Sequence, residues 1–96
     1  MNKTTHRPLF DLGRTLITPG ALEALTDAKQ SPVTFLERHA TGDWGECDRE
    51  DAIENDLALT QDSRILSVYR TTKGVRLWII TEADRSATTI LLPEEY

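Results

Sequence analysis

The sequence contains one cysteine, Cys47, and no long apolar run. A single cysteine forms no intrachain disulfide and no cysteine-based metal cluster. The acids Glu46, Asp48 and Glu50 surround Cys47 and disfavour its thiolate, so we do not expect a catalytic nucleophile there. No apolar stretch approaches the roughly 18 residues that span a bilayer, and residues 1–8 lack the apolar core of a signal peptide. We therefore expect a cytoplasmic protein that does not associate with membranes.

Motifs with a defined catalytic chemistry are missing as well. The chain has no P-loop, dinucleotide fingerprint, nucleophile elbow, zinc-ligand spacing, calcium loop or helix-turn-helix pattern. These absences argue against the enzyme classes that depend on such motifs. We expect no cofactor and no metal, and we favour a protein that is not an enzyme.

Charge is present but unevenly distributed. The net charge is −5, and residues 37–62 carry nine acids against two bases. Residues 63–85 reverse this balance, with five bases against two acids. The middle of the chain therefore forms an acidic block, which is followed by a basic segment.

The N-terminal half has the pattern of short helices. A chain of 96 residues is expected to form one domain, here residues 9–96 behind a flexible arm at 1–8. Thr18-Pro19 and Ser31-Pro32 each combine an N-cap residue with a proline at the first helical position. Asp48 is the expected N-cap of a third helix, in which Ile53 and Leu57 are predicted to form the inward stripe.

The C-terminal half has the pattern of strands. β-rich segments are predicted at residues 65–69, 75–81 and 86–92, joined by short polar turns. A short extra strand is plausible between residues 9 and 17. The predicted class is α+β, with two or three N-terminal helices packed on a C-terminal three-stranded antiparallel meander.

The acidic block suggests a binding function. Carboxylates spaced along a helix can imitate a row of phosphates and occupy a basic nucleic-acid channel on another protein. A solvated helix face is the simpler interpretation, and the two are not distinguished by sequence. The net charge argues against direct nucleic-acid binding, so the expected partner is a protein with a basic surface. The predicted contact residues are Asp43, Trp44, Glu46, Glu50, Asp51 and Glu54.

Two alternatives belong to other functional classes. The first is a metal-independent ribonuclease or toxin-like enzyme of barnase/RelE-type architecture. In it, His39 moves protons, and Arg85, next to Ser86, or Arg70 stabilises the phosphate charge. This rests on an analogy of fold, and a packed structural His39 is the competing interpretation. The second is a structural or regulatory accessory subunit, monomeric or dimerising through a free sheet edge.

Several stretches of the sequence resemble a family of small bacterial proteins described as plasmid-related or hypothetical. They are GDWG at 42–45, SRILS at 63–67 with Tyr69, WIITEADRSATT at 78–89 and LLPEEY at 91–96. The resemblance implies no catalytic residues. It implies a bacterial, cytoplasmic protein of a plasmid or other mobile element. Small acidic proteins of such elements often block host defences, which suggests an anti-CRISPR or anti-restriction role.

Overall fold

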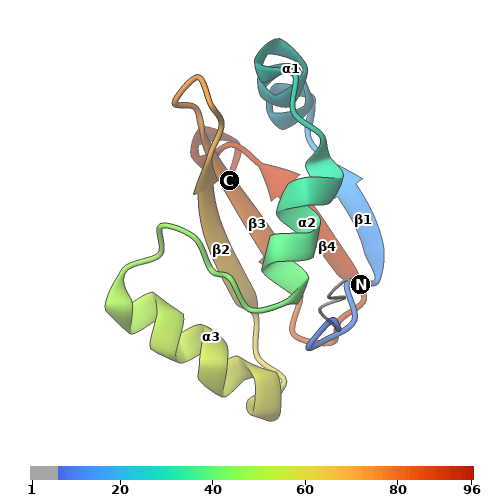
Figure 1. Ribbon diagram of the computed structural model, residues 1–96. Coiled ribbons are helices and arrows are strands. Elements are labelled where there is room, and N and C mark those ends of the chain that lie inside the picture. Colours follow the sequence, from blue (N-terminus) through green and yellow to red (C-terminus); the bar gives the residue numbers. More distant parts are fainter. Residues whose placement is uncertain (1–6) are drawn as a thin grey trace, which may run out of the picture.

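The computed structural model describes residues 7–96 (Figure 1). Most of the expected flexible arm, residues 1–6, lies outside the described part. The elements in chain order are β1 (Arg14–Ile17), α1 (Pro19–Ala28), α2 (Pro32–Ala40), α3 (Arg49–Gln61), β2 (Ile65–Arg70), β3 (Arg76–Thr81), β4 (Ala87–Leu91) and the short 3-10 helix η1 (Pro93–Glu95).

The α+β class is confirmed, but the sheet is larger than a three-stranded meander. Strands β2, β3 and β4 pair antiparallel in sequence order, as predicted. Strand β1 adds a fourth member parallel to β4, so the sheet is mixed and has the order β1-β4-β3-β2. Strand β1 lies within residues 9–17, where a short extra strand was expected, but its pairing with β4 was not predicted, because a pairing between the two ends of the described chain leaves no local pattern in the sequence.

The three helices start where their capping residues predict. Thr18, Ser31 and Asp48 each have extended backbone, and each side chain accepts a hydrogen bond from a backbone N–H of the first helical turn. Such caps satisfy donors that have no partner inside the helix. The predicted helix starts are therefore confirmed.

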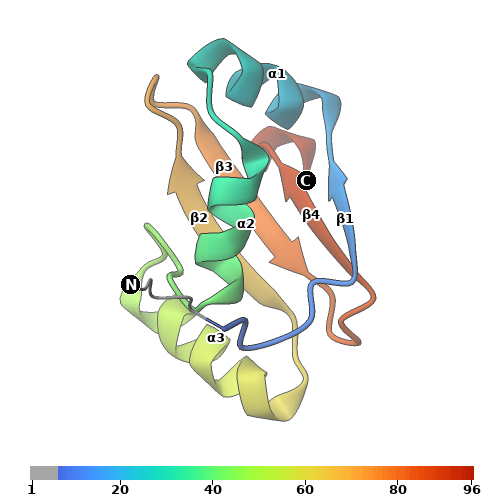
Figure 2. The same ribbon diagram turned by 45° about the vertical axis from the view of Figure 1, so that its right-hand side comes forward.

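The helices occupy different positions around the sheet. Figure 2 shows α2 lying across one face of the sheet, α1 at one end and α3 at the other end beside β2. On the covered face, Phe35 of α2 packs with Tyr69, Leu77, Ile79 and Ile90 of the strands. No helix among residues 7–96 is long and apolar enough to cross a membrane.

Helix α3 is rotated relative to the sequence prediction. Ile53 and Leu57 were expected to face inward, but their side chains are 50% and 45% exposed. The buried residues of α3 are Asn55 and Ala58. The Asn55 amide accepts a hydrogen bond from the Leu66 N–H at 3.0 Å and donates one to the Leu66 carbonyl at 2.7 Å. Ala58 also packs with Trp44 and Ile65, and Ala52 and Leu59 lie against this cluster. Helix α3, beside β2, is therefore held by the Asn55 hydrogen bonds and by this apolar contact, and the inward assignment of Ile53 and Leu57 was wrong.

The two edges of the sheet differ in whether their backbone groups have hydrogen-bond partners. At the β2 edge, beyond the Asn55 contacts, the Trp44 carbonyl and the Glu46 N–H bond the backbone of Val68. At the β1 edge, the parallel register directs the backbone groups of Thr15 and Ile17 away from β4. Those groups have no partner within residues 7–96, so β1 is an open edge.

Candidate functional site

A chain of buried hydrogen bonds is centred on His39 of α2. Its Nδ1 lies 2.6 Å from Ser67 Oγ and its Nε2 lies 2.9 Å from Thr81 Oγ1. Thr81 Oγ1 lies 2.7 Å from Thr88 Oγ1, which donates to the Leu12 carbonyl at 2.7 Å. The chain thus joins α2 to β2, β3, β4 and the segment that precedes β1.

The direction of each hydrogen bond in this chain follows from counting protons. A hydroxyl has one proton, and Thr88 uses its own on the Leu12 carbonyl. Thr88 must then accept from Thr81, and Thr81 must accept from His39 Nε2–H. Nδ1 is left as an acceptor for Ser67. His39 is therefore the neutral imidazole with its proton on Nε2, and every member of the chain is satisfied.

Burial keeps His39 neutral. Its side chain is 0% exposed, and the rings of Phe10 and Trp44 lie edge-on to the imidazole with centroids 5.2 and 6.0 Å away. Desolvation lowers the pKa of His39 to about 4. Both ring nitrogens are already bonded inside the protein, so the proton-transfer role considered for His39 gains no support from the geometry.

Arg85 is a structural clamp at the turn between β3 and β4. Its guanidinium donates to the carbonyls of Ala58 at 2.8 Å and Ser63 at 2.7 Å, and to the turn carbonyls of Glu82 and Ala83. One carbonyl belongs to the last turn of α3, where helix carbonyls lack intrahelical partners. The clamp therefore ties the end of α3 to the sheet. The guanidinium N–H groups that the ribonuclease hypothesis assigned to a phosphate are already bonded to backbone carbonyls.

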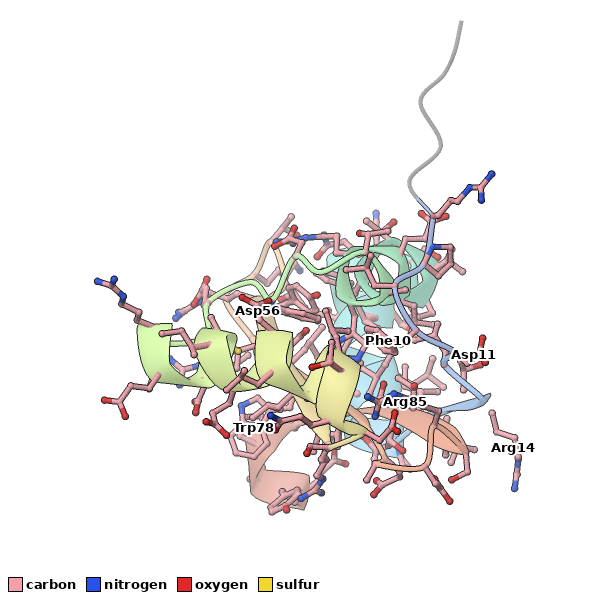
Figure 3. The ribbon with its side chains drawn as sticks, turned by 90° about the horizontal axis from the view of Figure 1, so that it is seen from below. Phe10, Asp11, Arg14, Asp56, Trp78 and Arg85 are labelled. Carbon is pink, nitrogen blue, oxygen red and sulfur yellow. The ribbon has the colours of Figure 1, made fainter. Side chains whose placement is uncertain are left out.

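Ser86 and His39 have separate surroundings. Ser86 is exposed, and its backbone N–H donates to Asp84 Oδ1 at 3.0 Å. No hydrogen bond within residues 7–96 joins His39 to Arg85 or Ser86. Phe10 lies between the two regions, because its ring contacts His39 and also lies 5.7 Å from the Arg85 guanidinium (Figure 3).

An open hollow of about 590 Å³ lies beside Arg85. Phe10, Asp11, Gly13 and Thr15 line it together with Arg85. The guanidinium in its wall is the one already bonded to four carbonyls. The hollow therefore offers no free cationic group to a ligand.

The predicted loop contacts are used inside the protein. Asp43 pairs with Arg38 at 2.7 Å, and the hydrogen bond from Arg38 lowers the pKa of Asp43. Glu46 pairs with Arg70 at 3.1 Å. Trp44 is 7% exposed and its Nε1 donates to Asp56 at 3.0 Å. These three positions fix the loop against the fold.

The predicted helical contacts are placed differently. Glu50, Asp51 and Glu54 are exposed on α3 and form no ion pair within residues 7–96. Glu50 and Glu54 share one helical face with Ile53 and Leu57, at the spacing i, i+3, i+4, i+7. We call these four residues, Glu50, Ile53, Glu54 and Leu57, the outer face of α3. The spacing was visible in the sequence, but the two apolar members were assigned to the core.

Within residues 7–96 the structure shows neither a metal-binding group of side chains nor a reactive thiol. Within residues 7–96, no group of three His, Cys, Asp or Glu side chains could hold a metal ion. Cys47 is half-buried, its thiol donates to the Leu66 carbonyl at 3.1 Å, and burial raises its pKa. A raised pKa keeps the thiol protonated and unreactive at neutral pH.

Comparison with known proteins assigns no function to these features. No family model, curated protein or solved structure matches the chain. The resemblance to plasmid-related bacterial proteins stays a prediction, and functional inference depends on the geometry described above.

Proposed function

We propose that the chain is a non-enzymatic binding protein that engages a basic protein surface through the outer face of α3. The observation that carries this proposal is the pair Ile53 and Leu57, two large apolar side chains about half exposed between carboxylates. Apolar surface rimmed by polar groups is typical of interaction sites. The rest of the helix is held by its own contacts and does not need this face for folding.

The two kinds of side chain on the outer face have different roles in the proposed complex. Burial of Ile53 and Leu57 in a groove of the partner would supply affinity, at about 1.5–3 kcal/mol for a fully buried side chain of this size. Glu50 and Glu54 would attract a basic partner and fix the register. This is the arrangement by which an amphipathic helix enters a groove on another protein.

A narrower form of the proposal is a nucleic-acid mimic that inhibits a defence system of a bacterial host. Its support is the run of unpaired carboxylates at Glu50, Asp51 and Glu54 on one helix. The defence setting comes only from the family resemblance. A channel that binds phosphates would not bury the apolar pair Ile53 and Leu57 at the centre of the outer face. We therefore favour the general proposal of binding to a basic protein surface.

The test uses two variants of the outer face and one control. The variants are Ile53→Ser/Leu57→Ser and Glu50→Lys/Glu54→Lys, and the control is Glu23→Lys/Glu37→Lys on exposed positions of α1 and α2. The tagged protein is used to capture partners from bacterial lysate, which are identified by mass spectrometry, and affinities are then measured by calorimetry.

We expect each outer-face variant to weaken binding at least about tenfold, the effect of losing about 1.4 kcal/mol, with the control near wild type. Urea unfolding of every variant verifies the fold. If the control weakened binding equally, the loss of affinity would be attributed to net charge. If both outer-face variants still captured the partner, the proposal would be wrong.

The open edge of β1 favours a second candidate, an accessory subunit that dimerises by sheet extension. Thr15 and Ile17 offer unpaired backbone groups there, which is the usual template for strand addition. Thr15→Pro removes the outward N–H without touching the β4 ladder. Light scattering should show a dimer that becomes a monomer in this variant, and a monomeric wild-type protein would remove this candidate.

A further inference from the structure

The sheet face opposite α2 is basic in a chain whose net charge is −5. Because side chains alternate along a strand, Arg14, Arg70, Arg76 and Trp78 point away from the face that α2 covers. No residue of the four strands is acidic; Glu82, directly after β3, and Glu46, which pairs with Arg70, are acids at the rim. We call this surface the open face. Figure 3 shows Trp78 and Arg14 on the side of the sheet away from α2.

Two arginines of the open face lie directly opposite each other. Arg70 of β2 and Arg76 of β3 are cross-strand partners in the antiparallel register. Like charges in this position are destabilising. Glu46 pairs with Arg70, whereas Arg76 has no hydrogen-bond or ion-pair partner within residues 7–96. Arg76 is thus the member of the pair that lacks a counter-charge within residues 7–96, and a bound anion would supply one.

Aromatic rings lie next to this arginine pair. Trp78 follows Arg76 by two residues on the same face of β3, and the ring of Tyr96 meets it edge-on at 5.6 Å. Tyr96 is 67% exposed. Arg64 donates to the Tyr96 hydroxyl at 2.7 Å, with its guanidinium 5.2 Å from the ring centroid. Arginines therefore flank the two rings over about 20 Å, the length of six strand residues.

We propose that the open face binds single-stranded nucleic acid. The guanidinium groups of Arg70, Arg76 and Arg64 contact phosphates, and Trp78 and Tyr96 stack on the bases between them. This combination of basic groups and aromatic rings characterises single-strand binding surfaces. The function lies apart from the outer face of α3 and goes beyond the binding role proposed for it.

The net charge is compatible with this proposal because the charges are segregated. The carboxylates of Glu50, Asp51 and Glu54 belong to α3, which lies at the β2 edge and does not cover the open face (Figure 2). Their repulsion acts at long range and is screened by salt. The expectation from sequence, that direct nucleic-acid binding is disfavoured, considered the sum of the charges and not their positions.

The main experiment measures fluorescence anisotropy of labelled 12-nucleotide oligo-U and oligo-dT against the full chain at 50 mM salt. We expect dissociation constants below about 100 µM, the range of non-specific binding, and at least tenfold weaker binding of a duplex of equal length. Tighter binding of oligo-U would identify RNA as the preferred strand and tighter binding of oligo-dT would identify DNA. Absence of binding, or equal binding of the duplex, overturns the proposal.

Arg76→Glu tests the arginine pair against a matched control. Arg49→Glu changes the net charge by the same amount at an exposed position of α3. We expect Arg76→Glu to weaken oligo-U binding at least about fivefold and to reduce the salt slope by about 0.7, the value for one phosphate contact on a single strand. Arg49→Glu should stay within about twofold. Equal weakening by both variants would attribute the effect to net charge and overturn the site.

Stability separates a binding role of Arg76 from a structural one. The Arg76→Glu variant places opposite charges across the β2–β3 pair, so its unfolding midpoint should rise or stay unchanged while binding is lost. A lowered midpoint would assign Arg76 a structural role and contradict the proposal.

Tryptophan fluorescence gives a second readout of the site. Oligo-U should quench the fluorescence of the wild type through Trp78, whereas it should leave the fluorescence of Trp78→Phe unchanged, because the remaining Trp44 is buried. Ile53→Ser/Leu57→Ser should bind oligo-U as wild type does, so each function can fail independently.

Discussion

Helices α2 and α3 illustrate two ways in which a helix is held by a sheet. Helix α2 lies across a sheet face and inserts Phe35 and His39 into the strands. Helix α3 lies along the edge of β2 and contributes Ala58 and the amide of Asn55. A face offers area for burial, whereas an edge offers backbone groups that need partners.

The comparison explains the surface of α3. Helix α3 is fixed by the Asn55 hydrogen bonds and by Ala52, Ala58 and Leu59, which pack with Trp44 and Ile65. Its large apolar residues, Ile53 and Leu57, are then not needed for folding and stay at the surface. The same geometry that covers the β2 edge therefore leaves the outer face of α3 exposed.

The largest expected effect breaks the contact of α2 with the sheet. His39→Ala leaves a cavity and removes the partner of Ser67 and Thr81, so we expect a loss of about 4 kcal/mol in the free energy of unfolding. Urea denaturation measures this, with Glu37→Ala on the exposed side of α2 as a control that should change stability by less than about 0.5 kcal/mol. A loss below about 1 kcal/mol for His39→Ala would contradict the structural role.

The matching change in α3 is Asn55→Asp. The shape is kept, but the carboxylate cannot donate to the Leu66 carbonyl and is a buried charge, so we expect a loss of about 3 kcal/mol. Urea denaturation at neutral pH is the measurement. Gln61→Glu adds the same charge at an exposed position of α3 and should cost less than about 1 kcal/mol. Similar losses in the two variants would mean that Asn55 does not hold the edge.

Acid should weaken the α2 contact selectively. The folded pKa of His39, about 4, lies below its ordinary value of 6.5, so the unfolded chain binds more protons between these values. The contribution of neutral His39 to the free energy of unfolding is complete above pH 6.5 and is lost as the pH falls towards 4. When the pH falls from 7 to 5, the free energy of unfolding of the wild type should decrease by about 2 kcal/mol more than that of His39→Gln. Parallel pH profiles would mean that His39 does not titrate with a lowered pKa.

The smallest expected effect distinguishes the outer face of α3 from a core. Ile53→Ser/Leu57→Ser should change the free energy of unfolding by less than about 1 kcal/mol, because both side chains are half exposed. Inward-facing residues of this size would cost about 4 kcal/mol or more when truncated together. Thermal and urea unfolding therefore decide directly between the sequence prediction and the structure.

Local features of this fold were predictable from sequence, because their causes are local. The helix starts at Thr18, Ser31 and Asp48 follow from side chains that bond their own first turn. The strands β2, β3 and β4 follow from the change of period and from the short turns between them. The acidic helix and the basic strands were also visible as a charge asymmetry.

Features that depend on distant parts of the chain were not predictable in the same way. The pairing of β1 with β4 and the chain from Ser67 through His39 to Leu12 join segments that share no local pattern. The Arg85 clamp is another such feature, because the carbonyls it binds come from α3, the following loop and its own turn. A count of charges also carries no information on which residues share a surface, such as the arginines of the open face.

The contact between the two ends of the described chain has a consequence for the order of folding during synthesis. Thr18 at the start of α1 donates to Glu95, which lies 77 residues later, and Glu95 also accepts from the N–H of Gly20. At roughly 5–20 residues per second on the ribosome, several seconds separate the synthesis of these partners. Strand β1 therefore cannot pair with β4 until residues 87–91 have been synthesised, and the first helix acquires its final cap only after nearly every other element of the described chain has been made.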